Sequence, residues 1–222
     1  MNQKKFIKDL AVVTASTAMI GAATCCYVRA GLGGDSVAVF LEGLSVAGGI
    51  SLGTASWLLN IVLVALALAM ARRYIGWTTV YSCILTGSFI DLADGILDPF
   101  FGLSDALWFR WGILGLGLLL LTAACALMIR FCPGMSIMDA IVTRISEKLG
   151  VSFRAVRMTI DAGLMLTGFL LGGVVGTGSV VAVLGTGPLI QFFVNWVKKL
   201  KKPLLFKAAV FALQGQSEHI DG

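Results

Sequence analysis

Charged residues are scarce in this sequence, and their scarcity disfavours most classes of soluble protein. Of the 222 residues, 13% are charged and 58% are hydrophobic. A soluble domain carries about 25% charged and about 45–50% apolar residues, because polar groups have to cover its surface. A soluble enzyme, a disordered chain and a disulfide-rich secreted domain are therefore disfavoured. The composition is that of a multi-pass membrane protein whose main partner is the lipid bilayer.

The sequence also lacks the motifs of catalysis and cofactor binding. It has one histidine, and its five cysteines form no CxxC pair, so neither a zinc site nor a redox pair is indicated. It has neither a Walker motif nor a Ser/His/Asp arrangement in its apolar segments. We therefore expect no enzymatic activity, no metal and no cofactor. The basic residues form no stripe with interleaved aromatic residues, so a nucleic-acid partner is not expected either.

Six apolar segments are each close to the ~20 residues that cross the ~30 Å hydrocarbon core of a bilayer. They are residues 10–30, 54–71, 75–95, 108–130, 153–173 and 177–197. With this arrangement, all 17 lysines and arginines except Arg29 and Arg110 fall on one side of the membrane. The positive-inside rule places that side, with both termini, in the cytoplasm.

The chain carries an internal repeat, because a shift of 100 or 101 residues aligns its two halves. The aligned pairs include residues 49–51 with 150–152, Asn60 with Asp161, and residues 85–91 with 185–191. The repeat divides the chain into residues 1–106, residues 107–200 and a cytoplasmic tail, residues 201–222. We therefore expect an all-α membrane protein of six transmembrane helices in two three-span repeats.

Three is an odd number of spans, so the second repeat must enter the membrane from the side opposite to the first. Inverted repeats of this kind recur in secondary transporters, where one half rocks against the other around a site near the midplane. A duplication that is preserved only for packing is the alternative interpretation.

Each half contains a short segment between its first and second spans. In the second half, Ile137, Met138, Ile141, Val142, Ile145 and Leu149 form an apolar stripe at helical spacing. Ser136 and Asp139 resemble a capping box at its start. A helix over residues 136–149 is only ~21 Å long, so it lies flat at the interface or re-enters the membrane. The first half has the same spacing over residues 37–44, with fewer charges, which favours a re-entrant helix there.

Asp161 is the strongest candidate for a binding residue, because an ionisable group inside a span is costly and usually functional. Its repeat counterpart, Asn60, enters the membrane from the opposite face, so the two could flank a site for a cation or a proton. An ion pair of Asp161 with Arg157, four residues earlier, is the alternative interpretation. For Asn60 the alternative is a hydrogen bond between helices.

The sixth span is rich in glycine and contains Pro188, which removes a backbone donor. This composition predicts a broken or kinked helix whose free backbone groups, with Thr186, Gly187 and Gln191, contact a ligand. Close packing of small residues is the alternative interpretation.

Asp91, Asp94 and Asp98 lie close to one helical face at the outer end of the third span, where they could attract a cation. A solvated acidic loop is the alternative. Asp91 is the deepest of the three and aligns with Gln191 in the repeat, so we count it among the candidate binding residues.

Two glycine-rich stretches, residues 30–35 and 185–193, together with the duplicated six-span plan, resemble the YczE/YyaS/YitT group of bacterial integral membrane proteins. The resemblance covers almost the whole chain. It implies a bacterial inner membrane and a transporter-like role, and it supplies no substrate and no catalytic residue.

We therefore predict a small secondary transporter or permease of an unknown small molecule or ion, with a homodimer as a possible assembly. Two other classes remain open: a substrate-binding membrane subunit of an ATP-driven importer, and an accessory membrane protein without a ligand.

Overall fold

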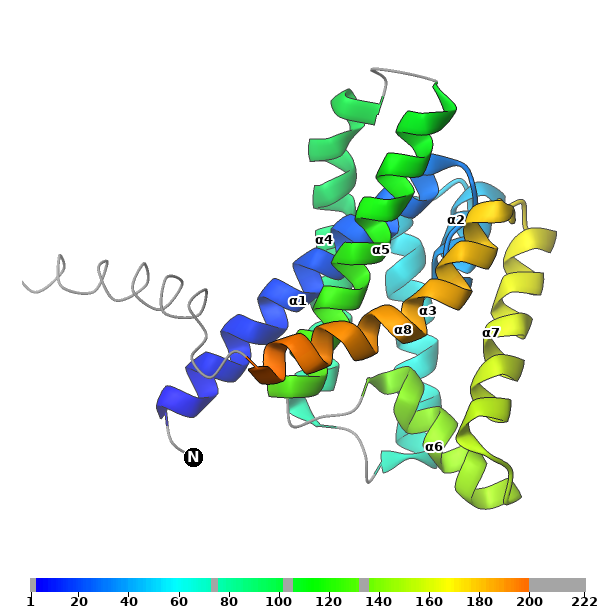
Figure 1. The fold of residues 1–222 in the computed structure, drawn as a ribbon. Helices are drawn as coiled ribbons and strands as arrows, with labels where there is room; N and C mark the ends of the chain where they lie inside the picture. Colours follow the sequence, from blue (N-terminus) through cyan, green and yellow to red (C-terminus); the bar gives the residue numbers. More distant parts are fainter. Residues whose placement is uncertain (1–2, 73–75, 102–105, 132–135, 200–222) are drawn as a thin grey trace, which may run out of the picture.

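The computed structural model describes residues 3–72, 76–101, 106–131 and 136–199, and these parts of the chain form eight helices and no strand (Figure 1). The helices are α1 (Gln3–Ala30), α2 (Ser36–Gly48), α3 (Leu52–Met70), α4 (Trp77–Phe101), α5 (Leu107–Phe131), α6 (Ile137–Leu149), α7 (Phe153–Leu170) and α8 (Thr177–Lys199). The all-helical prediction is confirmed for these residues. The predicted tail, residues 201–222, lies outside them.

Five helices are long and apolar enough to cross a membrane. Their apolar stretches are Asp9–Ala30, Leu52–Met70, Trp77–Pro99, Leu107–Ile129 and Thr177–Trp196, and each coincides with a predicted span. The remaining predicted span, residues 153–173, corresponds to α7, which has 18 residues and includes Arg154, Arg157 and Asp161. These charges interrupt its apolar run, so a sixth crossing stays a prediction.

The helix bounds follow the repeat that the sequence predicts. Helix α2 covers residues 36–48 and helix α6 covers residues 137–149, so both ends of the two helices differ by the same offset. In Figure 1 two pairs of counterparts run in opposite directions: α1 rises towards the top and α5 descends, whereas α3 descends and α7 rises.

The corner after each short helix is built in the same way in both halves. Gly49 and Gly150 end α2 and α6 in the left-handed conformation, with φ of 59° and 67°, which glycine adopts without steric cost. Two residues later a serine begins the next helix by accepting a hydrogen bond from a backbone N–H. The cap pairs are Ser51 with Thr54 and Ser152 with Ala155. The matched sequences at these corners therefore form matched structures.

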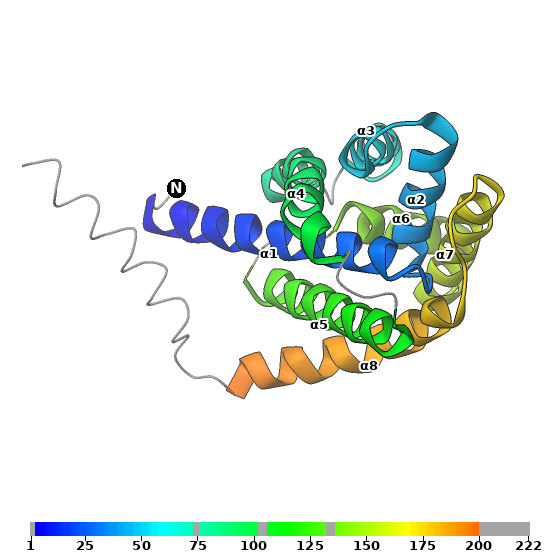
Figure 2. The same cartoon turned by 90° about the horizontal axis from the view of Figure 1, so that it is seen from above.

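Helix α1 lies at the centre of the molecule. Seen from above, it runs between α4 and α5, and α8 lies on the outer side of α5 (Figure 2). A core cluster joins α1, α5 and α8 through Tyr27, Leu114 and Ala182. Large apolar side chains are exposed on α3, α4, α5, α7 and α8, as expected of surfaces that face lipid.

The two halves pack against each other most extensively through α1 and α5, and a second junction forms where α2 packs against α7. At Gly168 an added Cβ would lie 2.6 Å from the carbonyl oxygen of Val39 and 2.7 Å from the Cα of Phe40, and Gly43 faces the Gly168 backbone in return. Only glycine permits two helix backbones to approach this far. The equivalent pair, α6 and α3, packs less extensively.

Two local predictions are wrong. Ser136 makes no side-chain capping bond at the start of α6, and the carboxylate of Asp139, which would complete a capping box, is paired with Arg157. Helix α8 continues from Thr177 to Lys199 through Pro188, so the predicted break does not form there, and a kink at Pro188 stays a prediction. The chain interrupts its helix earlier, between Leu170 and Thr177, where Gly172 has a φ of 103°.

The close contact of α2 with α7 predicts the effect of adding one methyl group. We expect Gly168→Ala to destabilise the protein by about 1–3 kcal/mol, because the new Cβ meets backbone atoms that have no room to move. The unfolding midpoint of the purified protein in detergent measures the effect.

Gly163→Ala in the same helix is the matched control, since a Cβ at residue 163 meets nothing within 4 Å. Alanine there should be neutral or stabilising by up to about 1 kcal/mol, because alanine favours a helix more than glycine does. Equal effects of the two substitutions would contradict the close contact.

Candidate functional site

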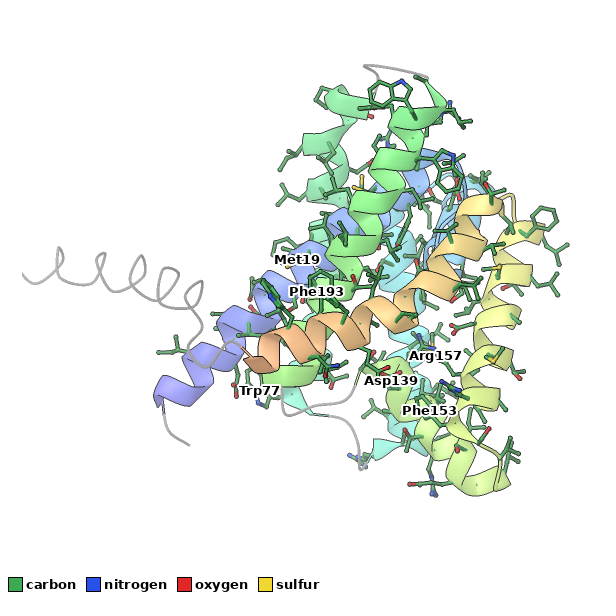
Figure 3. The ribbon with its side chains drawn as sticks, in the orientation of Figure 1. Met19, Trp77, Asp139, Phe153, Arg157 and Phe193 are labelled. Carbon is green, nitrogen blue, oxygen red and sulfur yellow. The ribbon has the colours of Figure 1, made fainter. Side chains whose placement is uncertain are left out.

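Arg157 of α7 is paired with two carboxylates from different helices. Its Nη1 lies 2.7 Å from Oδ1 of Asp139 on α6, and its Nε lies 2.9 Å from Oδ2 of Asp161 on α7. All three side chains are only about a third exposed, at 35%, 39% and 30%. Figure 3 shows Asp139 and Arg157 side by side between α6 and α7.

The start of α2, in the first half of the chain, contacts these paired side chains. The hydroxyl of Ser36 donates a hydrogen bond of 2.8 Å to Oδ1 of Asp161. Asp35 caps α2 by accepting a hydrogen bond from the backbone N–H of Ala38, 3.3 Å away. Its carboxyl also lies within electrostatic reach of Asp161 and Arg157. We call Asp35, Ser36, Asp139, Arg157 and Asp161 the ionic cluster; it joins the two halves.

Carboxylates outnumber guanidinium groups in the ionic cluster, so its full ionisation is unfavourable. Burial raises the pKa of the Asp35 carboxyl to about 6; the Ala38 N–H opposes this rise and the charge of Asp161 adds to it. Burial also raises the pKa of Asp139, and Arg157 opposes that rise. A half-buried site with an excess of negative charge is suited to take up a cation or a proton.

Asp161 and Asn60, the predicted pair, have different neighbours. Asp161 forms an ion pair with Arg157, as the alternative interpretation of Asp161 proposed. The amide of Asn60 donates hydrogen bonds of 3.3 Å to Ser56 Oγ on its own helix and to the carbonyl of Cys83 on α4. Asn60 therefore links α3 to α4, as its alternative interpretation proposed, and lines an open apolar groove of about 510 Å³ between them. Among the described contacts, none joins these two residues.

The predicted acidic face of α4 is engaged in contacts within the protein. The carboxylate of Asp91 accepts hydrogen bonds from the backbone N–H of Gly53, at 2.8 Å, and from Ser51 Oγ, at 3.1 Å. Asp94 and Asp98 both pair with Arg29 of α1. Over the described residues, no group of three or more His, Cys, Asp or Glu side chains is arranged to hold a metal ion.

The candidate residues of α8 lie apart from the described contacts of the ionic cluster. Thr186 donates a hydrogen bond to the carbonyl of Ala182 in its own helix, at 2.5 Å. A Cβ at Gly187 would meet nothing within 4 Å, and Gln191 is exposed. These three residues lie on the helix that packs on α5, and the structure brings no first-half polar group to them among the contacts described.

Sequence reasoning missed three members of the ionic cluster. Asp35 was assigned to a glycine-rich turn, Asp139 was assigned to a cap, and Ser36 was not singled out. All three lie within the first turn or at the cap of a short helix that the repeat places at corresponding positions. Asking which polar groups stand at the starts of these two helices would have found them.

The comparisons with known proteins show similarity along most of the chain. The pattern of a family of unknown function, DUF6198, matches residues 7–195. An uncharacterized protein of Haemophilus influenzae is 26% identical over 193 residues, which cover 87% of this chain and 86% of that protein. No solved structure matches. The family that matches is DUF6198, so the resemblance to the YczE/YyaS/YitT group stays a prediction.

The charge balance of the ionic cluster predicts the effect of removing its cation. We expect Arg157→Gln to lower the free energy of unfolding by about 1–3 kcal/mol, because it leaves three carboxylates without a counter-charge. The loss is below the ~3–5 kcal/mol of a fully buried pair, since these side chains are partly exposed. It should be smaller at pH 5 than at pH 8, because protonation relieves the repulsion.

Arg29→Gln is the matched control, because it also removes an arginine that pairs with two carboxylates. Its partner Asp98 is largely exposed, so we expect a loss of at most about 1 kcal/mol. Unfolding midpoints at both pH values measure the two variants, and a larger loss for Arg29→Gln would contradict the assignment.

Proposed function

Since this chain belongs to DUF6198, a family of unknown function, its activity has to be argued from the site, and we propose a small secondary transporter. In this proposal six spans form two inverted repeats in a bacterial inner membrane, with both termini in the cytoplasm. A small molecule or ion crosses the membrane between the two halves. The observation that carries the proposal is the ionic cluster, which lies where the two halves meet.

The cost of charge in a membrane supports a transport role for this cluster. Ionisable side chains inside a membrane protein are rare, face its interior and mark the paths of substrates or protons. Arg157, Asp139 and Asp161 satisfy one another across two helices, while Ser36 brings in a third. A protein without a ligand needs no such group, because apolar residues of similar volume hold helices together at least as well.

The unequal packing of equivalent helices supports alternating access. On one side of the ionic cluster, α2 is held tightly to α7 by Gly43 and Gly168, and Glu42 accepts a hydrogen bond of 2.9 Å from the N–H of Val174. On the other side, Arg144 of α6 donates to the carbonyl of Met70 at the end of α3. In the proposed cycle these two contacts close in turn, and the structure corresponds to the state closed between α2 and α7.

Accessibility of one native thiol tests this proposal without knowledge of the substrate. Cys125 of α5 lies within electrostatic reach of Asp35, Asp139 and Arg157. The chain would keep this cysteine and carry alanine in place of its other four. In oriented proteoliposomes, a membrane-impermeant maleimide added to one side at a time should label Cys125 from both sides, because the cluster opens to each side in turn.

Two exposed residues provide one-sided controls in a background without native cysteine. Val46→Cys near the end of α2 and Leu149→Cys at the end of α6 have similar exposure, 63% and 65%. Val46 lies beside Gly172, after the end of α7, whereas Leu149 shortly precedes the start of α7, so the two mark opposite ends of that helix. Each should be labelled from a single side. Labelling of Cys125 from one side only, or from neither, would contradict transport and favour an accessory protein. A requirement for co-purified ATPase subunits would favour the importer subunit.

A further inference from the structure

Asp35 is the carboxylate of the ionic cluster that Arg157 does not contact in the described hydrogen bonds. Asp139 and Asp161 each accept an N–H of Arg157, whereas the bond described for Asp35 is the 3.3 Å bond from the backbone N–H of Ala38. The single guanidinium is thus shared between the other two carboxylates. Asp35 is therefore the member of the cluster whose negative charge is least compensated.

A buried hydroxyl without a partner lies beside Asp35. Tyr27 of α1 is 2% exposed, and its Oη has no hydrogen-bond partner among the described residues. Its ring packs against the turn that carries Asp35, since a Cβ at Gly34 would lie 2.7 Å from the Tyr27 Cβ. Leaving a buried hydroxyl unpaired costs about 1–3 kcal/mol. A role for the unpaired Tyr27 hydroxyl would account for this cost.

Two electrostatic couplings place this hydroxyl at the ionic cluster. Tyr27 lies within reach of the Asp35 carboxyl and of the Cys125 thiol, and Cys125 lies within reach of Asp139 and Arg157. The groups within reach of Asp35 therefore come from α1, α5 and α7. Arg157 is the one cation among these named groups, and the rest are neutral or acidic, so their combined field favours the uptake of positive charge.

We propose that Asp35 is the site where this protein binds a proton as its coupling ion, with the Tyr27 hydroxyl as the group that stabilises the ionised carboxylate. In the binding step one O–H bond of a hydronium ion breaks as an O–H bond forms on a carboxylate oxygen of Asp35, and a water molecule is released. On release, the hydroxyl of Tyr27 donates a hydrogen bond to the carboxylate. The coupling role rests on the proposed transport function, whereas proton binding itself does not.

Three features of the site fit a proton in particular. The described residues supply no group arranged to hold a metal ion. The neutral carboxyl retains its carbonyl oxygen, so it can keep capping α2 after protonation. Burial raises the pKa of Asp35 to about 6. Asp35 therefore gains or loses its proton in a pH range in which ordinary carboxyl groups stay ionised.

Titration of the purified protein tests proton binding directly. Between pH 7.5 and pH 5 the folded wild-type protein in weakly buffered detergent should take up about one proton more than Asp35→Asn, because an unperturbed Asp titrates near pH 4. Asparagine is as good an N-cap as aspartate, so the variant keeps the start of α2. Asp98→Asn, which removes a largely exposed carboxylate outside the cluster, should match the wild type.

The same variant predicts a change in how stability depends on pH. The pKa of Asp35 is higher in the folded chain than in the unfolded chain, so its contribution is fully present below about pH 4 and is lost as pH rises through about 6. The unfolding midpoint of the wild type should therefore fall over this range relative to that of Asp35→Asn. Equal pH profiles of the two proteins would overturn the assignment of the proton to Asp35.

Two further arms test the role of Tyr27 and the identity of the ion. Tyr27→Phe should move the extra proton uptake to higher pH, because the ionised carboxylate loses its donor; an unchanged titration would overturn the role of Tyr27. The uptake should be the same in sodium and potassium chloride, and competition by either cation would overturn the choice of a proton. One-sided labelling of Cys125 together with normal titration would reject transport and leave the proton site standing.

Discussion

The junction of α2, α6 and α7 depends on the neutralisation of Arg157. A guanidinium stays ionised in a protein, so in an apolar setting it has to find carboxylates rather than lose its charge. Asp161 is supplied by the same helix, and Asp139 by the helix before it. Ser36 then ties Asp161 to the first half of the chain. This one positive charge therefore links α6 and α7 to α2, which lies far from them in sequence.

The positions that the predicted repeat aligns in α3 and α7 carry polar pairs of different charge. Four residues before Asn60 stands Ser56, and the Asn60 amide donates to it; at the corresponding positions Arg157 donates to Asp161. Both halves thus retain a polar pair with the same spacing on the same helix face. The pair is neutral in α3, which borders an apolar groove, and charged in α7, which faces the junction of the halves.

The elements of the fold could be predicted from the sequence because their signals are local. Apolar runs marked five spans, and the offset between the halves placed the corners at Gly49 and Gly150. The ionic cluster could not be predicted in the same way, because Asp35 and Asp139 each resemble ordinary helix-capping residues in their own segment. Only the packing of α2 on α7 brings them to one place. The same reasoning failed at Pro188, where a single missing donor does not break a helix whose other bonds persist.

The position of Asp35 links its charge to the contact that would have to open. Asp35 caps the start of α2, and the same helix is fixed to α7 further along by Gly43 and Gly168. A movement of α2 away from α7 must break the bond of Ser36 to Asp161, and it alters the distance from Asp35 to Arg157 at the same time. The charge on Asp35 therefore contributes differently to the closed and open arrangements, since its attraction to Arg157 changes with that distance. In the proposed transport cycle a proton on Asp35 would remove this difference, so proton uptake would shift the balance between the two arrangements by the amount that the charge had contributed.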